Sequence, residues 1–190
     1  MRTILALSLG VLLGAAVQAA LGQTLPAPPS GFQVDQQAAQ IMAKMRAAGV
    51  ADGVRATKAN ESMSSCFSDP KITFGYGWNL NPAGQMIIDM MLKVPQDPAS
   101  KSPQTLALDE PVIKQAYKNG VLEWRKQTWP VTTGHPCKDN QVVFYHGSWS
   151  GIAGNKIVGI SIDNLYNTKG QGQAWIDEYI DKVIGALNSK

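Results

Sequence analysis

His146 is the residue of this sequence whose type and surroundings best suit catalysis. Two-residue alternation predicts that it shares one face of a sheet with Ser161 and Asp163 of the next strand. A serine, a histidine and an acid form a hydrolytic triad only when the histidine can hydrogen-bond both partners. If the turn over 150–155 is symmetric, Ser161 lies diagonal to His146 and Asp163 lies farther away. We therefore expect a partly exposed structural histidine and assign no catalytic residue, with His146 as the candidate if there is one.

The segment Gly147–Gly151 has the outline of a hydrolase elbow but departs from it at the reactive position. It reads Gly-Ser-Trp-Ser-Gly, so Trp149 stands where the pattern G-x-S-x-G has its nucleophilic serine. The elbow also requires a strand, a sharp turn and a helix, whereas a β-hairpin is predicted here. The pattern therefore does not support a serine hydrolase.

Cys66 and Cys137 are the two cysteines of the chain, and we predict that they form a disulfide. The oxidising compartments that exported proteins enter favour such a bond. Closing a loop of this length would stabilise the fold by about 4 kcal/mol. The alternatives are two free thiols, or a metal site that also uses His135 and His146. Because His135 and Cys137 lack the paired C-x-x-C spacing that makes a zinc site specific, we expect no metal.

Two of the five tryptophans are candidates for binding a ligand. Trp129 is expected in a loop and Trp149 beside a turn, and aromatic rings in such places can form platforms for sugars or peptides. Trp124 and Trp175 instead fall on the apolar stripes of predicted helices, where they would be buried. None of the glycine-rich stretches follows a strand into a helix, so the sequence predicts no phosphate-binding loop and no cofactor.

Methionines gather at Met86, Met90 and Met91, and thioether sulfur is a soft ligand for Cu(I). Met86 and Met90 fall on the apolar side of a predicted strand, where methionine commonly fills a hydrophobic core. We therefore interpret these residues as core residues. A metal-binding periplasmic protein is the less favoured interpretation.

Residues 1–22 have the three parts of a cleaved signal peptide. Arg2 supplies a short positive start, residues 4–17 form an apolar stretch, and small side chains offer cleavage near Ala19 or Gly22. The apolar stretch is shorter than the roughly 20 residues of a membrane-spanning helix, which favours cleavage over an anchor. We expect a soluble protein of a periplasm or of the extracellular space.

The rest of the chain is interpreted as a proline-rich tether at 23–31 and a single domain at 32–190. The tether is expected to be extended and poorly ordered. The formal net charge of the 190 residues is +3, with no run of lysine and arginine, so we expect no nucleic-acid partner. No segment after residue 22 is apolar enough for a membrane span.

The first half of the domain is predicted to contain one helix and one β-hairpin. Apolar residues recur at helical spacing over 35–48, and Gly49 is a natural end. The polar segment 50–69 lacks a clear period and is expected to be mostly loop. Residues 72–78 alternate as a strand does. Residues 85–94 also alternate, so we predict a second strand there rather than the competing helix.

A helix, a second hairpin and a terminal helix are predicted for the second half. Asp109 can cap a helix over 109–126 that presents one apolar side. Strands over 141–149 and 156–163 flank a glycine-bearing turn. Residues 171–187 carry an unbroken apolar stripe and predict a helix. The expected core face of the second hairpin holds Val143, Tyr145, Trp149, Val158, Ile160 and Ile162.

These elements predict an α+β domain with the order α-β-β-α-β-β-α. Alternating strands and hairpin links imply an antiparallel sheet made from two β-hairpins, with helices covering one face in a sandwich. The run of hairpin, helix, hairpin and terminal helix over 72–187 is similar to the Mog1/PsbP-like fold seen in many exported proteins. The resemblance implies a fold and no activity, because fold does not fix function.

The sequence favours an exported, non-enzymatic binding or interaction protein. Its partner would be another protein or a component of the cell envelope. The alternative from a different class is a small secreted hydrolase that uses His146. An exposed apolar patch on the open face of the sheet would favour a protein partner. The sequence does not indicate which face is open, nor the oligomeric state.

Overall fold

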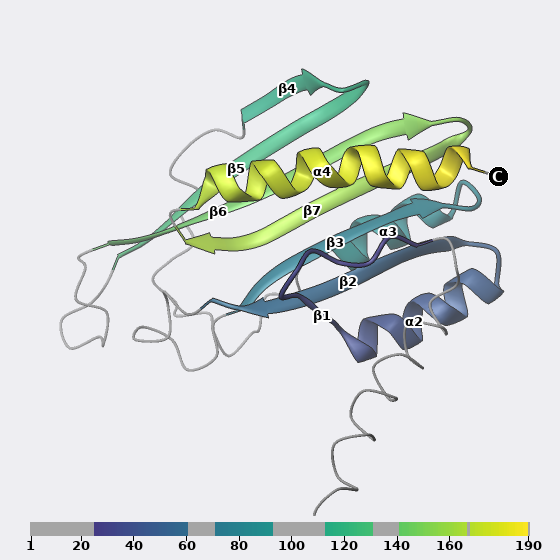
Figure 1. Ribbon diagram of the computed structural model, residues 1–190, viewed down its shortest axis with the longest axis horizontal. Coiled ribbons are helices and arrows are strands. Elements are labelled where there is room, and N and C mark those ends of the chain that lie inside the picture. The colour runs from purple at the N-terminus through teal and green to yellow at the C-terminus, as the bar shows by residue number, and fades with distance from the viewer. Residues whose placement is uncertain (1–24, 61–70, 93–112, 131–140, 167, 190) are drawn as a thin grey trace, which may run out of the picture.

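The computed structural model describes residues 25–60, 71–92, 113–130, 141–166 and 168–189 (Figure 1). These residues form a seven-stranded antiparallel sheet and three helices. In chain order the elements are β1 (Gln33–Val34), α2 (Gln36–Ala47), β2 (Ala51–Ala59), β3 (Lys71–Asn79), α3 (Gly84–Leu92), β4 (Ile113–Tyr117), β5 (Gly120–Pro130), β6 (Gln141–Ala153), β7 (Lys156–Tyr166) and α4 (Lys169–Asn188). Across the sheet the order is β1-β2-β3-β7-β6-β5-β4, so the last strand in the chain lies at the centre.

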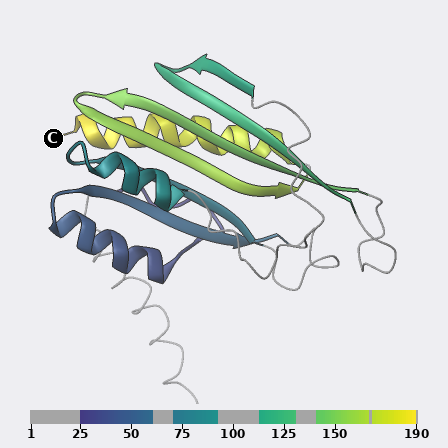
Figure 2. The same ribbon diagram turned by 180° about the vertical axis from the view of Figure 1, so that it is seen from behind.

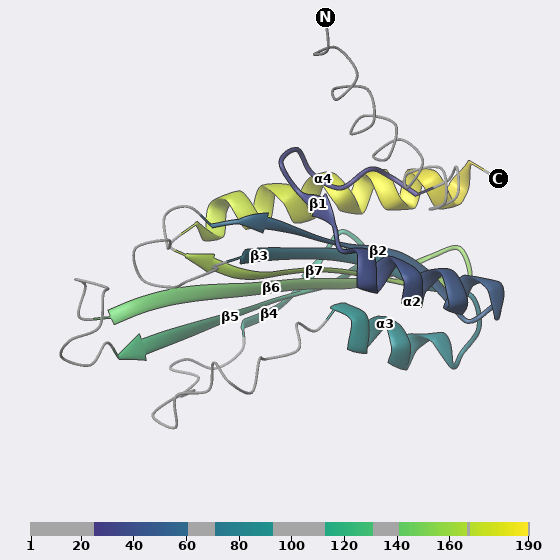
Figure 3. The ribbon, with the colours of Figure 1, turned by 90° about the horizontal axis from the view of Figure 1, so that it is seen from below.

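Helices lie on both faces of this sheet. Figure 3 shows α4 on one side and α3 on the other, with α2 beside β2. Seen from behind in Figure 2, α3 lies in front of the sheet and α4 lies behind it. The prediction that helices cover one face is therefore wrong. On the side opposite α4, the helix α3 packs on β2, β3 and β7.

The face of the sheet that meets α4, here called the inner face, carries the main hydrophobic core. Its large buried side chains are Phe74, Tyr76, Leu122, Trp124, Trp149, Val158, Ile160 and Ile162, and α4 adds Ile176, Tyr179, Ile180 and Val183. The α4 residues recur at helical spacing and so form one stripe. Because burying each large apolar side chain contributes roughly 1.5–3 kcal/mol, this layer dominates the stability of the fold.

The opposite face of β5, β6 and β7, here called the outer face, is mostly polar. Residues that stand opposite one another on neighbouring strands share a face. The register pairs Glu123 with Ser148, and Ser148 with Ser161. The outer face carries Val121, Glu123, Arg125, Gln127, Phe144, His146, Ser148, Ser150, Ile152, Ile157, Ser161, Asp163 and Tyr166. Strict alternation between the two faces is typical of an antiparallel sheet with one face on the core.

The predicted helix over 109–126 is wrong, because the part that the structure describes is the β4–β5 hairpin. Tyr117 pairs with Gly120, so the turn is Lys118–Asn119, whose two residues have φ of 44° and 58°. Positive φ at both central positions is typical of a type I′ turn, whose twist suits a hairpin. Gly120 is required there, since a Cβ on it would lie 2.4 Å from the carbonyl oxygen of Ser150.

The two-residue period of side-chain burial explains why this segment is a strand. Leu122 and Trp124 are buried on the inner face, whereas Glu123 and Arg125 between and beside them lie on the outer face. A helix would place neighbours at 3.6 residues per turn and could not separate these four residues so cleanly. The proposed cap Asp109 lies outside the described residues.

The predicted strand over 85–94 is also wrong, since the structure forms the helix α3 there as far as it is described. The N–H of Gly84 donates to the main-chain oxygen of Asn81 at 2.9 Å and to its Oδ1 at 3.2 Å. This side chain satisfies a donor at the start of the helix, as capping residues do. Because this segment is so apolar, its residues fit both the helical period of 3.6 and the strand period of 2. The sequence pattern alone does not distinguish the two structures.

The packing of α3 corrects the assignment of Met86. Ile88 is buried against Met42 of α2 and Ala51 of β2. Met86 instead is 67 % exposed, so the expectation that it fills the core is wrong. The helical period turns the two residues to different sides of α3, whereas the strand period had placed both on one face.

The predicted loop over 50–69 contains the strand β2, while residues 61–70 lie outside the described residues. Its first four residues are buried, including Asp52 and Gly53. The Asp52 carboxylate is paired with Arg46, with 2.6 Å between Oδ1 and Nη2. A strand buried on both faces does not alternate between polar and apolar residues, which explains why periodicity did not reveal it.

The predicted element order, the two-hairpin sheet and the sandwich are therefore wrong. The resemblance to the Mog1/PsbP-like fold was based on that order and is wrong as well. The observed order is β-α-β-β-α-β-β-β-β-α. The helices α2 and α4, the strand β3 and the β6–β7 hairpin do lie where spacing and alternation predicted them. The turn of that hairpin is only Gly154–Asn155, because Ala153 pairs with Lys156. The expected six-residue turn over 150–155 is thus wrong.

The predicted leader at 1–22 lies outside the described residues, so it stays a prediction. Residues 25–31, which belong to the predicted tether, pass along the inner face beside α4 before β1 begins (Figure 3). Leu25 packs against the core there, and Phe32 is buried in it. The domain of this structure therefore includes contacts from residue 25 onward.

Candidate functional site

The candidate site lies on the outer face, where a β-bulge interrupts the pairing of β6 with β7. Across the bulge β6 advances by two residues and β7 by three, so Asp163 and Asn164 stand opposite His146 alone. Asn164 has φ of 62°, a left-handed conformation that asparagine tolerates better than most residues. Bulges bend a strand locally and redirect side chains. The register set by the two-residue turn Gly154–Asn155 already directs Asp163 toward His146, and the bulge adds Asn164 beside them.

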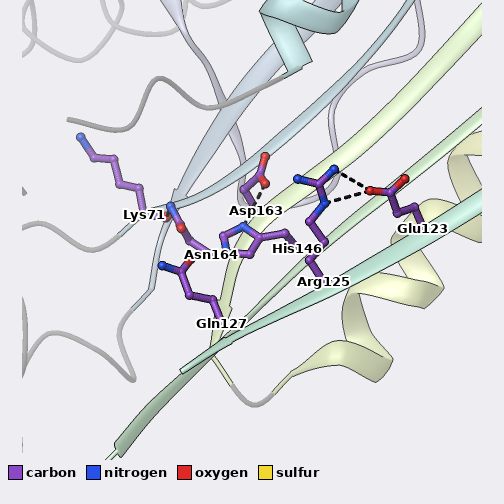
Figure 4. A network of polar contacts seen from close by, with 7 residues as sticks. All are labelled: Lys71, Glu123, Arg125, Gln127, His146, Asp163 and Asn164. Carbon is purple, nitrogen blue, oxygen red and sulfur yellow. Dashed lines mark hydrogen bonds and ion pairs between the residues drawn. The ribbon is translucent and has the colours of Figure 1, made fainter. Parts of the chain in front are cut away.

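Three side chains from three adjacent strands form what we call the His146 cluster: Gln127 of β5, His146 of β6 and Asp163 of β7 (Figure 4). Asp163 Oδ1 lies 3.0 Å from Nδ1 of the ring, and Gln127 Oε1 lies 3.1 Å from Nε2. The His146 and Asp163 side chains are 23 % and 17 % exposed, so water screens the pair only in part. The second carboxylate oxygen of Asp163 is buried and meets no donor among the described residues.

Both hydrogen-bond partners of the ring are oxygen acceptors. A neutral imidazole carries one N–H and can donate to one acceptor, whereas the imidazolium carries two. In either form both ring nitrogens are occupied in this arrangement, Nδ1 by Asp163 and Nε2 by Gln127. Neither nitrogen is directed at a nucleophile, as a general base requires.

The serines of the outer face do not complete a triad. Ser161 stands opposite Ser148 in the β6–β7 register and is 7 % exposed. The ring nitrogens of His146 contact Asp163 and Gln127. The sequence placed Ser161 nearer to His146 than Asp163, and the two-residue turn Gly154–Asn155 shifts the register so that Asp163 is the nearer residue.

A second group of charges lies beside the cluster on the same face (Figure 4). Arg125, the register partner of His146, places Nη2 2.6 Å from Glu123 Oε1. Lys114 of β4 reaches Glu123 Oε2 at 3.3 Å. Burial by itself would raise the pKa of Glu123, but the hydrogen bonds from Arg125 and Lys114 outweigh burial and lower it. Glu123 therefore stays charged and holds both cations in place.

The tryptophan candidates have different outcomes. Trp149 is 0 % exposed, packs in the core and donates from Nε1 to the main-chain oxygen of Tyr117 at 2.9 Å. It offers no surface to a ligand. Trp129 belongs to β5, not to a loop, and its side chain lies outside the described part of the structure. Trp124, expected on a helix, is a buried strand residue that donates to Gln173 of α4 at 3.0 Å.

The predicted disulfide and the alternative metal site cannot be placed on the fold, because Cys66, His135 and Cys137 lie outside the described residues. The Cys66–Cys137 bond therefore stays a prediction. Among the described residues, no three histidine, cysteine, aspartate or glutamate side chains come together as metal ligands do. Met90 and Met91 lie in α3, where their side chains are not described.

Sequence reasoning found His146 and Asp163 but missed Gln127 and the bulge. Gln127 was hidden because its segment was predicted to be at the end of a helix. The bulge did leave a signal: buried apolar residues of β7 step by two from Val158 to Ile162, and the next is Leu165, three residues later. A break in two-residue alternation next to an asparagine is typical of a bulge.

Comparison of this chain with models of protein families, with curated proteins and with solved structures gave no match. In the part of the chain that the structure describes, none of the helices combines the length and the apolar character that crossing a bilayer requires.

Proposed function

We propose that this chain is an exported, non-enzymatic binding protein whose partner is another protein. Export is inferred from the signal-peptide pattern of residues 1–22. The observation that carries the non-enzymatic part is the His146 ring, whose two nitrogens both meet acceptor oxygens, of Asp163 and Gln127. A general base needs an unprotonated nitrogen directed at the group that it activates. The cluster instead ties three neighbouring strands together.

A protein partner is supported by apolar side chains that stay exposed on the outer face. Val121, Ile152 and Ile157, here called the hairpin patch, are 47 %, 66 % and 37 % exposed. Ile152 stands opposite Ile157, and Val121 stands opposite Ser150, two residues from Ile152. Exposed apolar side chains that gather beside charged residues are typical of protein–protein interfaces. The charged side chains beside this patch are Lys114, Glu123 and Arg125.

The second candidate is a small secreted hydrolase, and one observation favours it. The hydrogen bond between His146 Nδ1 and Asp163 Oδ1, at 3.0 Å, is the half of a catalytic triad that orients the base. That function would require Gln127 to release Nε2 and a nucleophile to take its place. The two candidates therefore differ in what His146 Nε2 does.

Turnover measurements on the mature protein distinguish the two functions. We expect no hydrolysis above buffer from the wild type with chromogenic ester, peptide and glycoside substrates, and none from His146→Ala. Removing a general base typically lowers a rate by about 10²–10⁴-fold. Hydrolysis by the wild type that falls by about this factor in His146→Ala, with the thermal unfolding midpoint little changed, would contradict the non-enzymatic proposal.

Site-specific photo-crosslinking tests the binding part. A benzophenone amino acid at Ile152 in producing cells should give a discrete adduct, since that residue is the most exposed member of the hairpin patch. The same group at Ile41, which is 43 % exposed on α2, is the matched control. The adduct should disappear when Val121→Glu is added. Equal adducts from both positions, or none from Ile152, would count against a partner on the outer face.

A further inference from the structure

A short proline-rich segment lies over the inner face and is held there largely through its own main chain. This segment, residues 25–29 and here called the strap, has the sequence Leu-Pro-Ala-Pro-Pro. Tyr76 of β3 donates its hydroxyl to the main-chain oxygen of Pro26, and Tyr179 of α4 donates to that of Ala27. Two consecutive carbonyls are thus held by donors from opposite sides, the sheet and the helix.

The surface under the strap is aromatic. The Tyr76 and Tyr179 rings lie 5.2 Å apart, and the Phe74 ring lies 4.8 Å from that of Tyr179. Burial raises the pKa of Tyr76 and of Tyr179 well above the ordinary value, so both hydroxyls stay protonated as donors. An aromatic floor with donors directed at carbonyls is how proline-rich segments in the polyproline II conformation are recognised.

The strap is joined to the rest of the chain by a turn that can act as a hinge. The N–H of Phe32 donates to the oxygen of Pro29 at 3.0 Å, and Gly31 has φ of +82°. Phe32 itself is fixed, because its ring packs edge-on against Phe74 and Trp175 at 5.9 and 5.2 Å. Residues 25–29 can therefore leave without removing Phe32 or β1 from the fold.

We propose that the aromatic surface under the strap, formed by Phe74 and Tyr76 of β3 and Tyr179 of α4 and here called the groove, is a recognition site for an extended proline-rich segment of a partner protein, and that the strap is its internal competitor. The contacts support this because the two tyrosines bind main-chain oxygens, which every such segment has. Leu25 and Pro29 supply the strap's own packing, the first half-buried and the second buried. This site lies on the inner face, away from the hairpin patch. A failure of the proposal for the outer face would therefore leave this proposal intact.

The strap lowers the apparent affinity for a partner. A tethered segment acts at an effective concentration in the millimolar range, so a free segment must compete with it. The apparent dissociation constant then equals the intrinsic one divided by the fraction of molecules whose groove is open. Weakening the strap without touching the groove should therefore strengthen binding of a free peptide.

The test is fluorescence anisotropy with a labelled peptide Leu-Pro-Ala-Pro-Pro-Ser, a copy of residues 25–30, and the mature chain. In the double variant Leu25→Ser, Pro29→Ser we expect the peptide to bind about tenfold more tightly than in the wild type. Adding Tyr76→Phe and Tyr179→Phe to that variant removes both donors and should weaken binding about tenfold again. A peptide with alanine at each proline keeps the main-chain oxygens but loses the preformed extended conformation, so it should bind more weakly.

Controls separate loss of the groove from loss of the fold. The thermal unfolding midpoint and the near-ultraviolet circular dichroism of each variant are measured first, and Met86→Ser on the exposed side of α3 is the matched surface control. An affinity that does not change when the strap is weakened, or that ignores the two tyrosines, overturns the proposal. So does a dimer of the wild type in light scattering that the strap-weakened variant loses, since the groove would then take the strap of a second copy.

Discussion

The inner and outer faces of β5, β6 and β7 are made by the same three strands and are organised in different ways. On the inner face Leu122, Trp149 and Ile160 are fully buried and fit by shape. Glycines there leave room for the rings: a Cβ on Gly147 would lie 2.6 Å from the Trp124 ring. On the outer face the side chains are held by charge and hydrogen bonds, as in the His146 cluster.

This difference indicates how each face responds to change. A close-packed face cannot relax around a lost ring, so its energy depends on volume. A half-exposed polar face can replace some lost partners with water, so its energy depends on how well each charged group is shielded. Substitutions on the inner face should therefore lower the stability of the fold, whereas the outer face should tolerate substitutions that suit a partner.

Trp149→Ala should produce the largest effect, because it removes a fully buried ring and its hydrogen bond to Tyr117. We expect the free energy of unfolding to fall by about 3–5 kcal/mol, measured by urea denaturation. Ser150→Ala, next along β6 and exposed on the outer face, is the matched control and should change it by less than about 0.5 kcal/mol. Comparable losses from the two variants would refute the distinction between the faces.

Asp163→Asn should have an intermediate effect. It removes the charge that faces His146 while keeping the shape of the side chain, and the pair is partly shielded from water. We expect a loss of about 1–2 kcal/mol in urea unfolding at neutral pH. Ser148→Ala, on the same face and without a charge, serves as the control. A loss as small as that of the control would mean that the His146 cluster does not hold the strands together.

Glu123→Gln should have the smallest effect, and its size should depend on pH. The pKa of Glu123 is lowered in the folded protein by Arg125 and Lys114 against the opposing effect of burial. A lowered carboxyl pKa contributes stability that is fully present above the ordinary value of 4.5 and disappears as the pH falls through the folded-state value. Partly exposed ion pairs contribute about 0.2–1 kcal/mol. Urea unfolding at pH 7 should show this difference between wild type and variant, and at pH 3 the two should converge.

Much of the local structure follows from the sequence, because spacing along the chain fixes the period of each element. The α4 stripe of Ile176, Tyr179, Ile180 and Val183 predicts a helix that packs on one side. Alternation placed Trp149 and Ile160 on the core face and His146 on the other. These predictions are confirmed. They could be made from the sequence because the period of a strand or a helix, 2 or 3.6 residues, depends only on neighbours in the chain.

Tertiary structure decided the rest, where local patterns were ambiguous or silent. The strand β2 is buried on both faces of the sheet, one of them under α3. Its sequence therefore shows no two-residue alternation of polar and apolar residues. The segment 113–130 became a hairpin because its alternate residues fill the inner face. The two-residue turn Gly154–Asn155 set the β6–β7 register that brings Asp163 to His146, and the pairing of β5 with β6 placed Gln127 beside them. Contacts between strands distant in the chain depend on register, and one extra residue in one strand is enough to shift them.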